Sequence, residues 1–378
     1  MTHQFSKIHF EIMDETFVSL IDLLIKSNEV SKEFKGKHFY DIINDINKIS
    51  NNDFHAYIYD KSVIAFTDIL SSLVYKKNKN DFTLDEQRST FYETYFPYLF
   101  YKSGRKVFRF KEDLIYLLLE TGLNKVDSFF LRTPFKCIYL PIPETVKLLN
   151  PTGVPIDGIY VAVTDKSETK VSGLSNEFHS ITEQEYLKCE EPRNLFIGVV
   201  SDFLLHRFDA RNSFYYWSLM FREGDLLEQV DKYLDRYDRE LSGKPDYNRN
   251  FLERIFSFVL NSLLYINYKG DDFEIVRPKS DENVKSKKKK NKLANKTKIQ
   301  SLMVGQDIII NPRYKKEIDL SLANTNYRIR GKYSGRWMVR GHMKTQRFGT
   351  KFSESKIIWV QPYEKGEGDL TEKDYIIT

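Results

Sequence analysis

Apolar positions recur at helical spacing through the first 125 residues of the chain. In four runs, apolar side chains stand three or four residues apart, which predicts amphipathic helices. These runs are 17–25, 39–46, 63–73 and 111–119. Thr83 and Glu86 have the spacing of a capping box, so a further helix is expected to begin there and to bend or end at Pro97. We therefore expect a helical domain over residues 1–125.

The pattern changes at about residue 126. Four short runs are rich in β-branched and aromatic residues and are separated by Pro, Gly, Asp and Asn, which predicts strands. They read PFKCIYLPIP, GIYVAVT, NLFIGVVSD and SFYYWSLMF. A short helix is expected at 182–188, between the second and third strands, and helical spacing returns over 225–240 and 248–266. Residues 126–270 are thus expected to form an α+β domain.

A third change of pattern separates the C-terminal part. Residues 271–300 hold an acidic patch and then the run KSKKKKNKLANKTK, whose like charges repel one another and predict a linker. Four further strands are expected within 301–378. Their sequences are VGQDIIINP, NYRIRGKY, GRWMVRGHMK and SKIIWVQPY. The predicted fold class is α+β, with a helical N-terminal part, a mixed α/β middle and a small, basic, β-rich C-terminal module.

Charge is distributed unevenly between these parts. Residues 285–356 contain 20 Lys or Arg and four Asp or Glu, whereas the rest of the chain contains 38 basic and 49 acidic residues. A basic region attached to an acidic body is typical of proteins that bind polyanions. A chain rich in Lys and Asn through base composition alone would be basic throughout, and the body is not. We therefore expect that a chain ending before Lys285 folds and loses its affinity for polyanions.

Several function classes lack their motifs. The chain has no P-loop, GxGxxG, GxSxG or kinase motif set. Its seven His residues and two Cys residues, Cys137 and Cys189, lack the spacing of a metal site, so neither a metal nor another cofactor is expected. The two Cys residues also exclude a disulfide framework, and no apolar run has the length of a signal peptide or membrane span. We expect a cytoplasmic protein that does not enter a membrane.

The candidate site lies in the basic C-terminal part. In extended geometry alternate residues share a face, so Arg340, His342 and Lys344 are expected on one face of a strand whose other face is apolar. Cations that follow phosphates, with aromatic rings that stack on bases, are typical of surfaces that bind RNA or single-stranded DNA. The predicted nucleic-acid-binding residues are Lys287, Lys288, Lys289, Lys290, Arg328, Arg330, Tyr333, Arg336, Arg340, Lys344, Arg347 and Trp359. His342 is the candidate catalytic residue, because an imidazole can exchange protons near neutral pH.

Two resemblances rest on the same segment. The pattern Arg340-Gly341-His342, then Gly349, then Trp359-Val360-x-Pro362-Tyr363-x-x-Gly366 resembles the C-terminal signature of uncharacterised bacterial and mobile-element proteins. It differs from that signature at Met343, where those proteins have an aromatic residue. The Gly341-His342 pair is also similar to a strand of HicA-type toxins, which implies a fold like that of double-stranded-RNA-binding domains and a catalytic His. These likenesses imply a role in toxin–antitoxin systems, phage defence or mobile elements.

Three hypotheses of function remain open. The first is a nucleic-acid-binding protein that acts through its basic, aromatic-rich C-terminal sheet, with RNA favoured over DNA. The second is a His-dependent endoribonuclease, in which His342 acts as general acid or base while Arg340 and Lys344 hold the phosphate. The third is a protein–protein interaction module whose basic face binds an acidic partner.

Overall fold

The fold is known from a computed structural model, which describes twelve stretches of the chain. They are residues 8–11, 84–123, 125–165, 193–201, 214–241, 248–269, 274–276, 299–310, 315, 318, 337–339 and 341–365. The helices expected before Thr83 and at 182–188, the Lys run from Lys285 to Lys298 and the strand expected at NYRIRGKY lie outside the described residues.

One mixed sheet forms the body of the protein. Its seven strands follow the order β5-β4-β3-β2-β1-β7-β6, with β1 parallel to both β2 and β7 and the other neighbours antiparallel. The strands are β1 (Lys106–Phe110), β2 (Cys137–Pro141), β3 (Ile156–Asp165), β4 (Arg193–Ser201), β5 (Phe214–Phe221), β6 (Glu274–Val276) and β7 (Gln300–Val304). The four strands expected between 126 and 221 are confirmed as β2 to β5.

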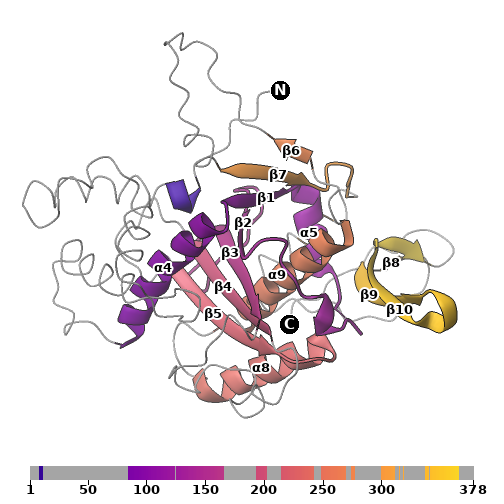
Figure 1. The fold of residues 1–378 in the computed structure, drawn as a ribbon. Helices are drawn as coiled ribbons and strands as arrows, with labels where there is room; N and C mark the ends of the chain where they lie inside the picture. The colour runs from indigo at the N-terminus through magenta and orange to yellow at the C-terminus, as the bar shows by residue number, and fades with distance from the viewer. Residues whose placement is uncertain are drawn as a thin grey trace, which may run out of the picture.

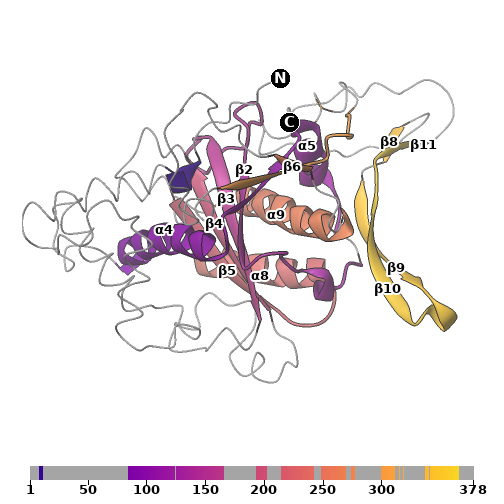
Figure 2. The ribbon, with the colours of Figure 1, turned by 45° about the horizontal axis from the view of Figure 1, so that its top comes forward.

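Helices cover both faces of this sheet (Figures 1 and 2). On one face lies α4 (Leu84–Lys102), and on the other lie α5 (Glu112–Glu120), α8 (Leu226–Leu241) and α9 (Arg249–Lys269). The helices expected near 84, 111, 225 and 248 are thereby confirmed, but α4 continues through Pro97 to Lys102. Because both faces are covered, every residue of β4 is buried, as the near-continuous apolar run in its sequence requires.

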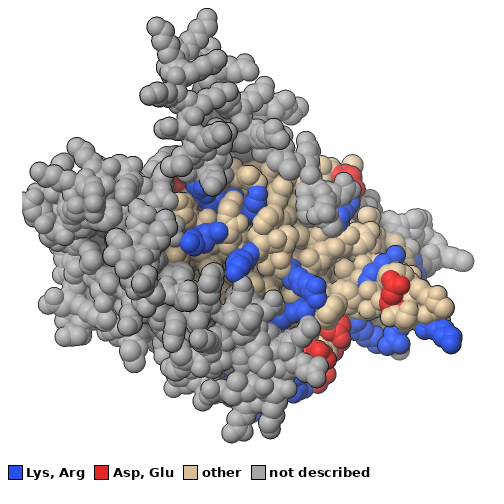
Figure 3. Space-filling view, viewed as in Figure 1, with Lys and Arg blue, Asp and Glu red and all other residues tan. Residues whose placement is uncertain are grey.

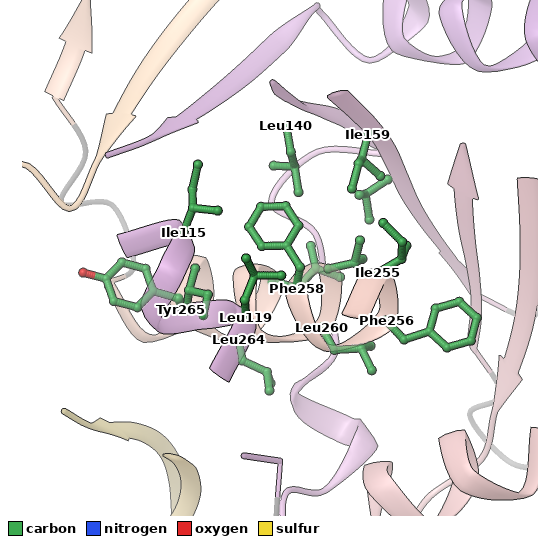
Figure 4. Close-up of a cluster of buried hydrophobic side chains, with 14 of the residues drawn as sticks. Ile115, Leu119, Leu140, Ile159, Ile255, Phe256, Phe258, Leu260, Leu264 and Tyr265 are labelled. Carbon is green, nitrogen blue, oxygen red and sulfur yellow. The ribbon is translucent and has the colours of Figure 1, made fainter. Parts of the chain in front are cut away.

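The main core lies between the sheet and α9. This helix buries thirteen residues between Phe251 and Ile266, and all of them except Asn261 and Ser262 are apolar. They pack against α5 and against the sheet residues Leu140 and Ile159 (Figure 4). Such all-round burial indicates that α9 is an interior helix, with the sheet on one side and other elements on the other.

The C-terminal strands form a long hairpin with an interruption. β9 (His342–Phe348) pairs with β10 (Glu354–Val360), and β8 (Trp337–Val339) pairs with β11 (Tyr363–Lys365), as two separate two-stranded sheets. At the interruption a Cβ on Gly341 would lie 3.0 Å from Cδ of Pro362, and a proline cannot donate a ladder hydrogen bond. The single strand expected across GRWMVRGHMK is therefore broken at Gly341.

The first strand of the C-terminal part lies in the main sheet rather than beside the hairpin. The run VGQDIIINP was expected to be a strand, but the strand is β7, which ends at Val304. β7 lies between β1 and β6 in the main sheet, so this sheet takes strands from both sides of the boundary that the sequence predicts near residue 300. The fold class is α+β, as expected.

Candidate nucleic-acid interface

Hairpin β9–β10 is anchored to the body at its base. Met343, Ile357 and Trp359 are 0%, 7% and 7% exposed and belong to the main core. The Trp359 ring meets the Tyr265 ring of α9 edge to face, with 5.1 Å between centroids, a favourable geometry for an aromatic pair. The base of the hairpin is thus part of the hydrophobic core.

Backbone hydrogen bonds fix the same end of the hairpin. The Gly122 N–H donates to the Gly341 carbonyl at 3.0 Å, and the Met343 N–H donates to the Gly122 carbonyl at 3.0 Å. Gly122 is itself held by the end of α5, where the buried Asn261 amide donates to the carbonyls of Leu118 and Thr121 at 2.9 and 2.8 Å. An interior helix therefore positions the residue that receives the hairpin.

The outer half of hairpin β9–β10 extends away from the body (Figures 1 and 2). Every residue from Gln346 to Lys356 is exposed. Residues 342–360 carry four cations against the single acid Glu354, and none of the four forms an ion pair with any described residue. The cations are Lys344, Arg347, Lys351 and Lys356. Figure 3 shows Lys and Arg side chains along this projection.

The strand register divides these side chains between two faces. His342 and Lys344 are two residues apart on β9 and therefore point to the same side, as expected. The residues directly opposite them on that side are Val360 and Ile358. On that side the Lys356 ammonium lies over the Phe348 ring, 5.3 Å from its centroid. The other face begins in the core at Met343 and ends at the exposed Arg347.

The tip of the hairpin is a tight turn with exposed aromatic rings. Phe352 is 69% exposed and Phe348 is 37% exposed. Gly349 has φ of 78°, and Lys351 and Phe352 have φ of 56° and 57°, a region that side chains other than glycine rarely adopt. The turn thus presents Lys351 and Phe352 in a conformation that carries a local energetic cost.

The sequence-predicted site residues are only partly described. Lys344 and Arg347 lie on the exposed hairpin, and His342 lies partly exposed at its base. The other predicted residues, apart from Trp359, lie outside the described residues. These are Lys287, Lys288, Lys289, Lys290, Arg328, Arg330, Tyr333, Arg336 and Arg340.

Trp359 is buried rather than exposed on the candidate interface. Its ring is buried against α9, so it is not available to stack on a base, and its assignment to the interface is wrong. The alternation of Ile357 and Trp359 marks the face toward the core. Conversely, Lys351 and Lys356 were not predicted; the signal that could have found them is their position just after Gly349, with Lys351 in the turn and Lys356 on the strand that follows it.

His342 has no catalytic partner among the residues that the structure describes. Its side chain makes no hydrogen bond to a described residue, and its backbone forms an isolated β-bridge with Gly122. Within the same described stretches no group of three His, Cys, Asp or Glu side chains is placed to hold a metal ion. Among the described residues, the structure therefore offers no second catalytic residue for the endoribonuclease hypothesis.

Two titratable side chains are buried far from the hairpin, near α4. The His9 Nδ1 lies 3.0 Å from the Tyr160 hydroxyl, and burial lowers the pKa of His9 to about 3. Burial also raises the pKa of Glu93 to about 8. In both cases the low-dielectric surroundings disfavour the charged form. Neither residue was predicted, because a single His or Glu gives no signal in a sequence without known partners.

Comparison with known protein families identifies the chain's relatives. Residues 108–363, from β1 to β11, match the AcrVA2-like family, described as the anti-CRISPR type V subtype A2 family. The chain belongs to this family. The match spans the main sheet, α9 and hairpin β9–β10, so the candidate interface lies within the AcrVA2-like part of the chain.

Comparisons with curated proteins and with solved structures add less evidence than the family match. No curated protein matches the chain. The crystal structure of AcrVA2 aligns with 95% of this chain over 99% of its own length, at 14% identity and a TM-score of 0.44. AcrVA2-like membership agrees with the expected link to phage, defence and mobile elements, whereas the likeness to HicA-type toxins has no support from these matches. In the described residues no helix has the length and apolar character needed to cross a bilayer.

Proposed function

We propose that this AcrVA2-like protein inhibits type V CRISPR systems and that it does so by binding nucleic acid, RNA in preference to DNA, through hairpin β9–β10. The family supports the first part of the proposal. The second part rests on one observation: four cations and two exposed aromatic rings occupy a projection whose outer half is fully exposed.

Electrostatics favours a polyanion as the ligand. Cations that neutralise phosphates release condensed counterions, which supplies much of the free energy of nucleic-acid binding. On the hairpin, Lys344 and Arg347 point to opposite faces, and Lys351 occupies the turn. A flexible strand can wrap such a projection and reach all three cations. The lysines from Lys285 to Lys298 precede this part in sequence and add further positive charge.

RNA is favoured because of the aromatic rings. Proteins that recognise RNA mostly bind single-stranded stretches, whose bases can stack on aromatic side chains. An acidic protein surface would use the cations and could also pack on Phe348 and Phe352, whereas alternating phosphates and bases match cations that stand beside aromatic rings. We therefore place nucleic acid before an acidic protein partner, and binding tests separate the two.

The first experiment measures binding against salt. A labelled single-stranded RNA, the same sequence as single-stranded DNA and a DNA duplex are titrated with wild type and with the double variant K351Q/K356Q. The slope of log affinity against log salt should fall by about 0.7 for each lost phosphate contact on a single strand. The matched control is K147Q/K232Q, which removes the same charge at exposed positions outside the hairpin. Equal binding by the two double variants would contradict the proposal.

The second experiment measures inhibition in cells that carry a type V CRISPR system. Expression of the wild-type chain should restore transformation by a targeted plasmid, and K351Q/K356Q should restore it less well than K147Q/K232Q. If K351Q/K356Q loses RNA affinity and still inhibits fully, RNA binding is not the means of inhibition. If wild type cleaves the RNA without a metal and His342→Ala does not, the nuclease hypothesis replaces a pure binding role.

A further inference from the structure

The tip of hairpin β9–β10 presents two exposed aromatic rings. Among the described residues, the exposed Phe side chains are Phe129, Phe348 and Phe352, and two of these lie within five residues of each other at the tip. Phe352 is the most exposed of the three, at 69%. Exposed aromatic rings beside cations indicate a surface that contacts a ligand.

Backbone geometry holds Phe352 in this position. Its N–H donates to the Gly349 carbonyl at 3.2 Å, and the Ser353 N–H donates to the Thr350 carbonyl at 3.3 Å. Phe352 nevertheless has φ of 57°, which costs free energy for a residue with a side chain. A ring that was needed only for folding would be expected to recover this cost by packing, and this ring is mostly in solvent. A role in binding explains why such a residue occupies the turn.

Phe348 is already paired with a cation. The Lys356 ammonium lies over its ring, so one side of the ring is occupied by positive charge that can also meet a phosphate. Phe352 has no such neighbour among the described residues and keeps its ring available. Cations beside open rings match the needs of a strand whose phosphates and bases alternate.

We propose that the tip selects unpaired bases, with Phe352 as the main stacking residue and Phe348 as the second. This inference rests on the proposed function and specifies its ligand: single-stranded segments or loops rather than continuous duplex. In a duplex each base is stacked on its neighbours, and its π face is not accessible to a side chain. A two-stranded ribbon can also enter the major groove of B-DNA, but that mode would depend on Lys344 and Arg347 rather than on Phe352.

The test compares an RNA strand with the same strand annealed to its complement. Phe352→Ala and Phe352→Leu should weaken binding of the single strand by about 5- to 150-fold, the range that corresponds to 1–3 kcal/mol for a stacked base. Binding of the duplex should stay within about twofold of wild type. Phe352→Trp should retain single-strand affinity, because it keeps a flat aromatic face. The control is Phe129→Ala, an exposed Phe of the body.

A second readout reports on stacking itself. An RNA that carries 2-aminopurine should lose fluorescence on binding to wild type and to Phe352→Trp, and should lose much less on binding to Phe352→Leu. If Phe352→Leu binds and quenches like wild type, or if single strand and duplex weaken equally, the inference is wrong. These results are independent of the charge test: K351Q/K356Q can still lose affinity when the Phe352 variants do not, in which case the cations bind and the tip does not select.

Discussion

Asn261 is the single residue that links the core most directly to the candidate interface. It is fully buried in α9, yet its amide serves the carbonyls of Leu118 and Thr121 at the end of α5. The last carbonyls of a helix lack partners within the helix, and leaving a buried acceptor without a hydrogen bond costs about 1–3 kcal/mol. The side chain therefore both stabilises α5 and fixes Gly122 beneath the hairpin.

Replacing Asn261 should destabilise the protein more than its size suggests. We expect Asn261→Leu, whose side chain has the same number of non-hydrogen atoms, to lower the free energy of unfolding by about 1–3 kcal/mol. The Thr121 carbonyl loses its side-chain donor, and the Leu118 carbonyl keeps only the bond from the Thr121 N–H at 3.4 Å. Urea unfolding followed by circular dichroism measures this change. The comparison variant is Ser257→Ala, which removes a hydroxyl that donates to the Leu119 carbonyl at 3.3 Å and accepts from the Asn261 amide at 3.3 Å. A loss no larger than that of Ser257→Ala would contradict the role assigned to Asn261.

Glu93 should make stability fall as the solution becomes more alkaline. Because its folded-state pKa is raised from 4.5 to about 8, the stability that it contributes is complete below about pH 4.5 and is lost as pH rises through 8. Between about pH 4.5 and pH 8 the free energy of unfolding falls by up to about 1.4 kcal/mol for each pH unit. His9 has a lowered pKa, so its contribution is complete above about pH 6.5 and is lost only on acidification.

The window between about pH 6.5 and pH 8 therefore isolates Glu93. In Glu93→Gln the free energy of unfolding should be nearly constant across this window, whereas that of wild type should decrease. Urea unfolding at several pH values measures both. Parallel pH profiles for the two proteins would show that the Glu93 carboxyl has an ordinary pKa in the folded chain.

Among the structural elements, hairpin β9–β10 combines two opposite surfaces. Its base contributes Met343 and Trp359 to the core, while everything from Gln346 to Lys356 is exposed. Alternation along the strands predicted that His342 and Lys344 share a face and that Met343 lies on the other, and the register agrees. Arg347, however, lies on the same face as Met343, and Val360 and Ile358 lie opposite His342 and Lys344. Alternation could not predict that the apolar face would end halfway along the hairpin, because that depends on where α9 lies.

Shortening the hairpin should therefore separate stability from binding. Thr345 and Ile357 are directly opposite, so an Asn-Gly turn can join them in place of residues 346–356. We expect the free energy of unfolding to change by less than about 1 kcal/mol, because only exposed residues are removed. RNA affinity should be lost, as measured by fluorescence anisotropy.

Trp359→Ala supplies the opposite case at the base of the same hairpin. Truncating this buried ring should cost about 3–5 kcal/mol of unfolding free energy, as measured by urea titration. A shortened hairpin that is as unstable as Trp359→Ala would show that the outer half packs on the body. A shortened hairpin that retains full RNA affinity would contradict the proposed function.

At the scale of the whole molecule, the C-terminal part contributes a strand to the main sheet. β7 pairs along all five residues of β1, from Lys106–Gln300 to Phe110–Val304. Leu302 and Val304 are buried, as are Ile308 and Ile310. The C-terminal part therefore completes the sheet of the body as well as carrying the hairpin.

A chain that ends before Lys285 should consequently fail to fold cooperatively, although charge alone predicts a folded remainder. Removing β7 leaves β1 without one of its two neighbours and exposes the core beneath Trp359. We expect a broad thermal transition, weak near-ultraviolet circular dichroism and binding of a hydrophobic dye. The shortened-hairpin variant, which keeps β7, serves as the control. A sharp transition in the truncated chain would restore the division predicted from charge.

The sequence by itself determined the local helices and strands and the positive charge of the candidate interface. Helices α5, α8 and α9 and strands β2 to β5 follow from apolar spacing, because side chains within one element already show which face must be buried. The excess of Lys and Arg after residue 285 also follows from counting. What it could not determine is which segments meet. The insertion of β7 beside β1, the burial of Trp359 against Tyr265 and the exposure of Phe352 all depend on contacts between residues far apart in the chain. Only the tertiary structure decides those contacts, because they arise from packing the whole core at once.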